Sequence, residues 1–247
     1  MLITSLENKK IKKYATLNNS KGRKKERAFL IEGMHLCEEA YKKGLLLDVL
    51  LEDGEKLSFN YDKEITYVTP NILKKISMLT NYSKVIGVCK FLDNKGIVGN
   101  HILILDDVRD PGNLGTIIRS AKAFLVDTII LSENSVDIYN DKVLRSTEGM
   151  IFNINILYGN LEKMIPNLKM NGFAILGTDV KNGVDVRDIK ECKYALIMGN
   201  EGHGVRECIK NLCDKNLYIK MNKDCESLNV GVATSILLYE LNRSEYE

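Results

Sequence analysis

The sequence has no apolar run of the about 18 residues that a membrane-spanning helix needs. Its first residues, MLITSLENKK, also lack the short apolar core that marks a secretory signal. We therefore expect a cytoplasmic protein that has no membrane partner.

Cysteine and histidine are sparse and dispersed. The six cysteines include no C-x-x-C pair, and the three histidines, His35, His101 and His203, do not cluster with them. Structural zinc sites need closely spaced ligands of these types, and disulfide frameworks belong mostly to secreted proteins. We expect reduced thiols that are mostly buried, with no disulfide and no metal.

The net charge of +2 conceals a strong asymmetry along the chain. Residues 1–27 contain nine lysines and arginines but only two acids, Glu7 and Glu26, so this segment is +7 and the remainder −5. A cationic block of this density is typical of a surface that neutralises nucleic-acid phosphates. The alternative is a solvated end of an amphipathic helix with no specific partner.

The 247 residues, of which 45% are hydrophobic, suffice for one large domain or two modest ones. Residues 1–95 are predicted to form a small α/β unit, in which Pro70 can open a helix. The turn-rich stretch between Asp93 and Asn100 marks a boundary, so we place a second domain at residues 100–247. The elements expected in the first unit are helices at 5–17, 33–43 and 71–78 and strands at 28–31, 48–52 and 84–89.

Short apolar runs alternate with helical patterns throughout the second domain. Runs of three or four apolar residues separated by helices are typical of a parallel sheet covered on both faces. We therefore predict a doubly wound α/β fold. The runs are 102–105, 128–131, 154–157, 173–176, 195–198 and 217–219.

Polar and glycine residues follow three of these runs, where ligands bind in open α/β sheets. In the first segment, DPGNLGTIIR, we expect Asn113 to cap a helix that carries Arg119 on the same face, six residues further on. The alternative is a plain cap and a surface cation.

The second segment, GNEGHG at 199–204, has three glycines in six positions, which let the backbone approach a ligand. It has neither the spacing G-x-G-x-x-G nor a following Gly-Lys-Ser/Thr, so it is no phosphate loop of a known type. Taken alone, the segment is better explained by a tight connection between strand and helix without a ligand.

In the third segment Glu226, Ser227 and Asn229 precede a strongly apolar helix. A helix cap formed by Ser227 would account for one polar residue but not for three. This surplus of polar side chains indicates a functional site.

Taken together, DPGNLGTIIRSAKAF, IMGNEGHGV and IKMNKDCESLNVGVA resemble, in order and spacing, the three motifs of the SpoU/TrmH-type RNA ribose 2′-O-methyltransferases of the SPOUT superfamily. LRSTEGMIF, at 144–152, is similar to a family segment between the first two motifs. KKERAFLIEGMHLCEEA resembles the substrate-binding domain, similar to ribosomal protein L30e, that precedes the catalytic domain in many members.

This resemblance implies a catalytic domain with a deep trefoil knot, S-adenosylmethionine as cofactor, and a homodimer whose sites are completed across the interface. It also implies methyl transfer to a ribose 2′-hydroxyl of RNA. The cofactor would be held largely by backbone groups at Gly199, Ile219 and Leu228, with Thr178 nearby. The residues implied in catalysis are Asn113, Arg119, Glu226 and Asn229.

The family's account makes Arg119 the acceptor of the hydroxyl proton. A guanidinium has a pKa above about 12 and stays protonated, so we expect Arg119 to hold the phosphate beside the reacting ribose, and we leave the general base open. Three positions depart from the family pattern: Lys220 replaces a common proline, Gly231 a common serine, and Leu125 a glycine that often closes the first helix.

The domain arrangement favours large-subunit (23S) ribosomal RNA as the substrate, with transfer RNA as the alternative. A noncatalytic RNA-binding protein is a competing function, but it leaves the polar residues of the three motifs unexplained. A Rossmann-type nucleotide enzyme is disfavoured because its glycine fingerprint is absent.

Overall fold

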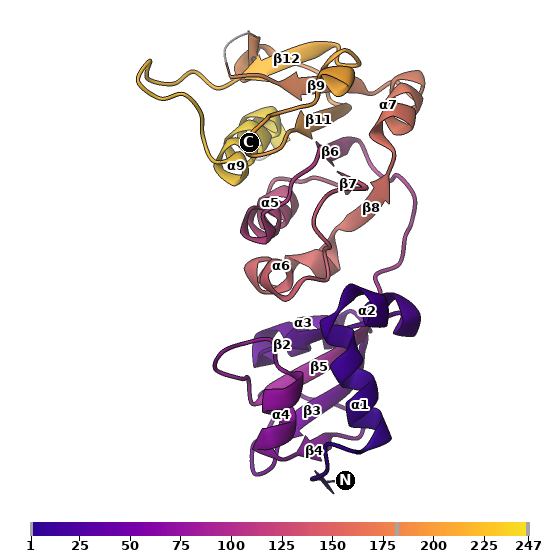
Figure 1. Ribbon diagram of the computed structural model, residues 1–247. Coiled ribbons are helices and arrows are strands. Elements are labelled where there is room, and N and C mark those ends of the chain that lie inside the picture. The colour runs from indigo at the N-terminus through magenta and orange to yellow at the C-terminus, as the bar shows by residue number, and fades with distance from the viewer. Residues whose placement is uncertain (1, 181–182, 246–247) are drawn as a thin grey trace. The chain divides into compact units, whose positions relative to one another are not determined.

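A computed structural model describes residues 2–180 and 183–245 (Figure 1). The chain divides into two compact units, each described here by itself. The first comprises Met1–Asp93 and Tyr139–Phe152, and the second comprises Asn94–Ile138 and Asn153–Glu247.

In the first unit the described residues form a five-stranded mixed sheet with the order β1-β4-β3-β5-β2. Strands β1, β3 and β4 run parallel, and β5 is antiparallel to β3 and β2. The strands are β1 (Leu2–Ile3), β2 (Ala28–Glu32), β3 (Leu46–Glu52), β4 (Thr66–Val68) and β5 (Val85–Lys90). The helices are α1 (Lys9–Ala15), the short 3-10 turn Thr16–Asn18, α2 (Ser20–Glu26), α3 (Met34–Lys42) and α4 (Pro70–Ile76).

Helices cover both faces of this sheet. Ile11 of α1 and Ile72 of α4 share a buried cluster with Leu50 and Ile86. On the opposite face Gly87 leaves room for α3, since a Cβ at this position would lie only 3.0 Å from the Sγ of Cys37. Apolar residues that alternate along β3 and β5 thus supply two cores, as period-2 side-chain geometry requires.

The segment Tyr139–Phe152 falls within the second predicted domain but packs with the first unit. It contains α6 (Asp141–Ser146) and the start of a 3-10 turn, Met150–Asn153. The ring of Tyr139 stacks on Phe91 with centroids 4.3 Å apart and also contacts Phe29 at 4.5 Å. These aromatic contacts join residues far apart in the sequence, which periodicity alone does not reveal.

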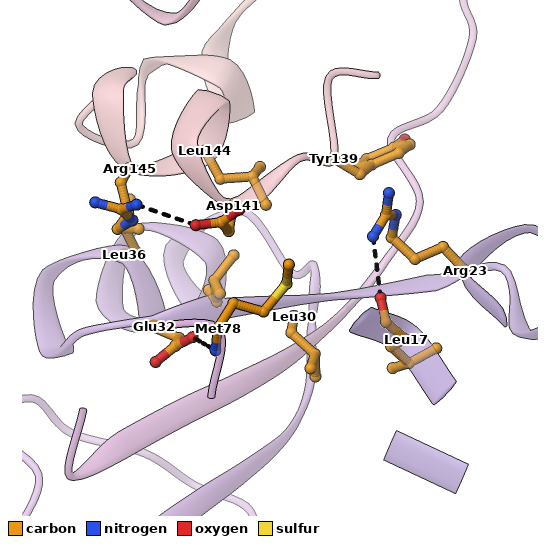
Figure 2. Close-up of a pocket in the computed structure, with 11 residues that line it drawn as sticks. Leu17, Arg23, Leu30, Glu32, Leu36, Met78, Tyr139, Asp141, Leu144 and Arg145 are labelled. Atoms are coloured by element: carbon orange, nitrogen blue, oxygen red, sulfur yellow. Dashed lines mark hydrogen bonds and ion pairs between the residues drawn. The ribbon is translucent and has the colours of Figure 1, made fainter. Parts of the chain in front are cut away.

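Figure 2 shows a small pocket in the first unit where α6 faces β2. Asp141 pairs there with Arg145 at 3.0 Å, and Arg23 donates to the carbonyl of Leu17 at 3.1 Å. None of the eight predicted site residues lines this pocket, so the predicted chemistry lies elsewhere.

The second unit contains a seven-stranded parallel sheet within the described residues, with the order β10-β12-β9-β11-β6-β7-β8. This confirms the predicted α/β class and all six predicted strands. The strands are β6 (His101–Leu105), β7 (Thr128–Ser132), β8 (Asn155–Gly159), β9 (Ala174–Thr178), β10 (Val184–Asp185), β11 (Tyr194–Met198) and β12 (Lys215–Tyr218). The helices are α5 (Pro111–Ala123), α7 (Leu161–Met170), α8 (Glu207–Lys210) and α9 (Val230–Leu241).

Helices α7 and α8 share one buried cluster with the sheet, through residues such as Ile165, Ile209 and Ile197. Helices α5 and α9 lie together on the other side of the sheet (Figure 1), where the hydroxyls of Ser120 and Ser235 are 2.7 Å apart. The strand order agrees with the expected family fold, and the trefoil knot stays a prediction.

The cysteines correct one expectation. Cys37 and Cys89 are buried, but Cys192, Cys208 and Cys225 are exposed, and Cys213 is partly buried. The thiols are unpaired but not mostly buried, because half of them stand in loops or on an exposed helix side rather than in strands. In the described part of the chain no helix is both long and apolar enough to span a membrane.

Candidate active site

The chain leaves β6 at Asp106 and enters α5 through a sharp turn. Asp110 caps this helix: its Oδ1 accepts a hydrogen bond from the amide of Asn113 at 2.8 Å. The expectation that Asn113 is the cap was wrong by one turn, because Pro111 takes the first helical position, where a missing N–H costs nothing. The side chain of Asn113 is therefore available for other contacts.

Arg119 lies further along α5 and points in a different direction from Asn113. Six residues of an α-helix turn through about 600°, which leaves the two side chains about 120° apart, so the same-face expectation was also wrong. Arg119 is exposed and has no hydrogen bond or ion pair with any described residue. An exposed, unpaired guanidinium is suited to bind an external anion.

The glycine-rich turn after β11 closes on itself. The amide of Asn200 donates to the carbonyl of Gly204 at 3.0 Å, and the amide of Gly204 donates back at 2.9 Å. Gly199 is buried beneath this turn, and a Cβ there would lie 2.1 Å from the carbonyl carbon of Gly204. The glycine at 199 is thus required by the turn itself, independently of any ligand. His203 is exposed.

Glu201, in the middle of this turn, is the residue that the sequence analysis missed. Its Oε1 accepts hydrogen bonds from the amide of Asp110 and from Nδ2 of Asn113, both at 3.1 Å. Its Oε2 accepts one from Nδ2 of Asn200 at 3.2 Å. It is the only acid in the glycine-rich segment, which was the available signal.

These contacts set the charge state of Glu201. Partial burial by itself raises the pKa of this carboxyl group. Hydrogen bonds from Asn113 and from the backbone amides of residues 201, 110 and 109 outweigh that effect, so its pKa lies below the ordinary value. Glu201 is therefore an ionised anchor rather than a proton acceptor.

The third segment joins the same network through Asn229. Its Oδ1 caps α9 by accepting from the amides of Gly231 at 2.9 Å and Val232 at 3.3 Å, so Asn229, not Ser227, is the cap. Its Nδ2 donates to Oδ1 of Asn113 at 2.9 Å. A continuous chain of hydrogen bonds, Glu201 to Asn113 to Asn229, thus connects all three motifs.

Glu226 and Leu228 stand apart from this chain. Glu226 is exposed, and no hydrogen bond or ion pair within the described residues uses its carboxylate. Leu228 is half-buried, and the described structure contains no partner for its backbone amide or carbonyl. Both groups are available to a ligand.

Three of the four residues expected at the cofactor lie on three adjacent strands or next to them, and the fourth, Leu228, lies in the loop before α9. Thr178 ends β9 and donates from its hydroxyl to the carbonyl of Ile197 at 2.9 Å. Gly199 directly follows β11 and Ile219 directly follows β12. Because β12, β9 and β11 are neighbours, their carboxyl ends meet at one edge of the sheet, which is where open α/β sheets bind ligands.

The groups at this edge are chemically suited to bind S-adenosylmethionine. The backbone groups of Leu228 are uncommitted, as an adenine held by main-chain contacts requires, and no described cluster of His, Cys, Asp and Glu competes as a metal site. Two of the departures from the family pattern fit the structure. Lys220 is exposed, so a lysine side chain has room at this position. Gly231 packs closely against α5, where a Cβ at this position would lie 3.2 Å from Thr116.

Leu125, the third departure, adopts a left-handed conformation with φ of 59°. The amide of Val126 donates to the carbonyl of Ala121 at 2.9 Å, which is the hydrogen bond of a Schellman helix end. A glycine would adopt this conformation at lower cost, which explains why the position commonly holds one.

Two models of known protein families match this sequence. Residues 100–239 match the SpoU rRNA Methylase family, and residues 8–87 match the MRM3-like substrate binding domain. The chain belongs to the SpoU rRNA methylase family. It is an S-adenosylmethionine-dependent RNA methyltransferase, as the three motifs indicated.

Three RNA methyltransferases are similar along nearly the whole chain. The 23S rRNA (guanosine(2553)-2′-O)-methyltransferase RlmP of Bacillus subtilis (strain 168) is 35% identical over 97% of this chain and 98% of its own. The AdoMet-bound rRNA methyltransferase of Sinorhizobium meliloti is 29% identical with a TM-score of 0.86, covering 99% and 98%. An RNA 2′-O ribose methyltransferase structure is 27% identical with a TM-score of 0.83 and covers 100% of both chains.

Proposed function

We propose that this protein transfers the methyl group of S-adenosylmethionine to a ribose 2′-hydroxyl of large-subunit ribosomal RNA. The observation that carries the proposal is the hydrogen-bonded chain from Glu201 through Asn113 to Asn229, which draws the three motifs into one site. The similarity to RlmP, whose name specifies 23S rRNA and a guanosine 2′-oxygen, supports the choice of substrate. We assign RNA binding to residues 1–95 and methyl transfer to residues 100–247.

The two asparagines act as positioning groups. Nδ2 of Asn113 donates to an ionised carboxylate, so its Oδ1 must face Asn229, and the capping of α9 by the Oδ1 of Asn229 orients its amide in turn. Amide side chains bind no proton at physiological pH, so neither can serve as the base. Their fixed orientation keeps α5 and α9 in register around the reacting groups.

Arg119 binds the phosphate beside the target ribose. It is exposed and unpaired among the described residues, and its planar guanidinium can donate two parallel hydrogen bonds to a phosphate. Held in this way, the ribose is oriented for in-line attack, which lowers the activation barrier of a bimolecular transfer.

Glu226 and Glu201 take different parts because their surroundings differ. Glu201 is saturated with donors, which lower its pKa and weaken it as a base. Glu226 has no donor within the described structure and stands two residues before Leu228, at the cofactor edge. We assign Glu226 to the reacting ribose and Glu201 to the support of Asn113. S-adenosylmethionine supplies an activated methyl group on a sulfonium at this edge.

A second copy of the chain is the partner we propose for α9. Val232, Ile236 and Tyr239 recur at spacings of four and three on one side of this helix and are 48%, 37% and 48% exposed. A helix that is apolar on all sides is normally covered on all sides. A twofold dimer brings this stripe against its own copy, and substitution of Ile236 by Asp should then yield monomers in light scattering after size exclusion.

Incubation of the purified protein with tritium-labelled S-adenosylmethionine tests the function. We expect label in 23S rRNA and none in transfer RNA, in linkages that resist alkaline hydrolysis because the 2′-oxygen is blocked. Label confined to transfer RNA would reassign the substrate, and absence of label in any RNA would overturn the proposal. We also propose that the protein acts in the cytoplasm, and the support is its similarity to RlmP of Bacillus subtilis, a bacterium, in which ribosomes are assembled in the cytoplasm.

A further inference from the structure

The nine cations of residues 1–27 fall into two groups: those that are paired with groups of the described structure and those that are not. Lys10 pairs with Asp48 at 2.6 Å and Lys13 with Glu26 at 2.9 Å, while Lys12 pairs with Glu7. Arg23 is 7% exposed and donates to the carbonyl of Leu17. Four of the nine cations are thus already committed to groups within the protein.

Three of the remaining lysines form one surface on α2. Lys21, Lys24 and Lys25 are exposed, and none has an ion-pair partner in the described part of the chain. Their spacing of three and four residues places them on one side of the helix. Three unneutralised charges so close together repel one another and favour an anionic partner.

Arg27 follows this helix and lies on an aromatic stack. Its guanidinium carbon is 5.2 Å from the centroid of the Phe91 ring, which in turn stacks on Tyr139 at an interplanar angle of 17°. The backbone of Arg27 is held in a left-handed conformation, with φ of 51°, and its carbonyl accepts from the amide of Phe91 at 3.1 Å. Although anchored in this way, Arg27 remains exposed.

An exposed guanidinium that is supported from below by an aromatic ring is a platform for a flat, electron-rich partner. Nucleobases stack on arginine planes where RNA strands are unpaired, and the A-form duplex does not offer its bases in this way. The lysines of α2 precede this platform in the chain by two to six residues and supply contacts for flanking phosphates.

We propose that α2 and Arg27 form the contact with an unpaired nucleotide of the substrate RNA. The base stacks on Arg27, and Lys21, Lys24 and Lys25 bind the adjoining phosphates. This inference rests on RNA being the substrate in the proposed function, and it selects four residues from the basic block, with Phe91 as the support.

Two RNA probes test the stacking: a short duplex with one bulged 2-aminopurine nucleotide and the same duplex fully paired. The full-length protein should bind the bulged probe more tightly and quench its fluorescence. Arg27→Lys retains the charge but not the plane, and we expect it to bind the bulged probe about tenfold more weakly, with the paired probe unchanged. Arg27→Asn, whose side chain tolerates the left-handed backbone, serves as the second variant.

The phosphate contacts are tested by salt dependence. Lys21→Gln/Lys24→Gln/Lys25→Gln should reduce the slope of log Kd against log salt by about two to three. The reason is that binding releases fewer counterions when fewer phosphates are contacted. The matched control is Lys43→Gln/Lys74→Gln/Lys75→Gln, which removes the same charge from exposed positions of the same unit. Its slope should change by less than one.

Equal slopes for the two triple variants would overturn the phosphate contacts. Retention of the preference for the bulged probe by both Arg27 variants, with normal thermal unfolding, would overturn the stacking. The binding experiments contain no S-adenosylmethionine, so a failure of the methyl-transfer assay would count against the proposed function and not against this surface.

Discussion

Asn229 donates a hydrogen bond to Asn113 at 2.9 Å, although 116 residues separate them in the chain. The same Asn229 side chain caps α9 through its oxygen, while Asn113 donates onward to Glu201. Each amide therefore has one orientation, because its oxygen and nitrogen face groups of opposite hydrogen-bonding character. The rigidity of the site follows from this ordered chain.

Replacement of Asn229 separates its two tasks. Asn229→Asp keeps an oxygen that can cap α9, so we expect the free energy of unfolding to stay within about 0.5 kcal/mol of the original. The variant loses the donor to Asn113 and should lose most of its turnover. Asn229→Ala loses the cap as well and should be less stable by about 1 kcal/mol. Chemical denaturation and initial rates measure both effects, and full activity of Asn229→Asp would contradict the assignment.

The ionisation of Glu201 predicts how stability changes with pH. Its pKa is lowered in the folded protein, so its contribution to stability is present above its unfolded pKa of about 4.3 and is lost as the pH falls through the folded pKa. Glu201→Gln should be less stable near neutral pH, because an amide group then faces backbone donors. The difference in unfolding free energy from the original protein should shrink in acid. A difference that is the same at all pH values would rule out this origin.

Arg119 should matter for the reaction and not for the fold. Arg119→Ala is expected to abolish nearly all methyl transfer, while calorimetry with S-adenosylmethionine shows unchanged affinity. Because the side chain is exposed and unpaired in the described structure, the free energy of unfolding should change by less than about 0.5 kcal/mol. Arg119→Lys retains the charge without the planar fork and should recover only part of the rate. Retention of most activity by the alanine variant would refute the role.

Leu125 offers a stabilising substitution. Its left-handed backbone strains a side chain that is 39% exposed, so Leu125→Gly should increase the free energy of unfolding by about 0.5–1 kcal/mol. Leu125→Ala retains a Cβ and should show no such gain. Differential scanning calorimetry compares the two, and equal midpoints for both variants would argue against backbone strain.

Much of the second unit could be predicted from the sequence. Every apolar run assigned to a strand lies in a strand, because short runs of three or four apolar residues fit a parallel sheet that is covered on both faces. The three polar segments were located for a related reason, since ligand sites follow the carboxyl ends of such strands.

Particular contacts within those segments depended on the tertiary structure. Asp110 rather than Asn113 caps α5, and Asn229 rather than Ser227 caps α9, because several neighbouring residues could cap each helix and only the folded backbone selects one. Glu201 became a member of the site because the first two segments meet in space, where its carboxylate accepts hydrogen bonds from Asp110, Asn113 and Asn200.

In the basic block of residues 1–27, too, the sequence determined one property and the tertiary structure another. Its charge of +7 was determined by the sequence, which by itself indicated a polyanionic partner. Which cations remain available was decided only by folding: Asp48 neutralises Lys10 from a strand 38 residues away, and Arg27 finds its support on Phe91. Local patterns report burial and charge, whereas pairing between distant residues depends on how the chain packs.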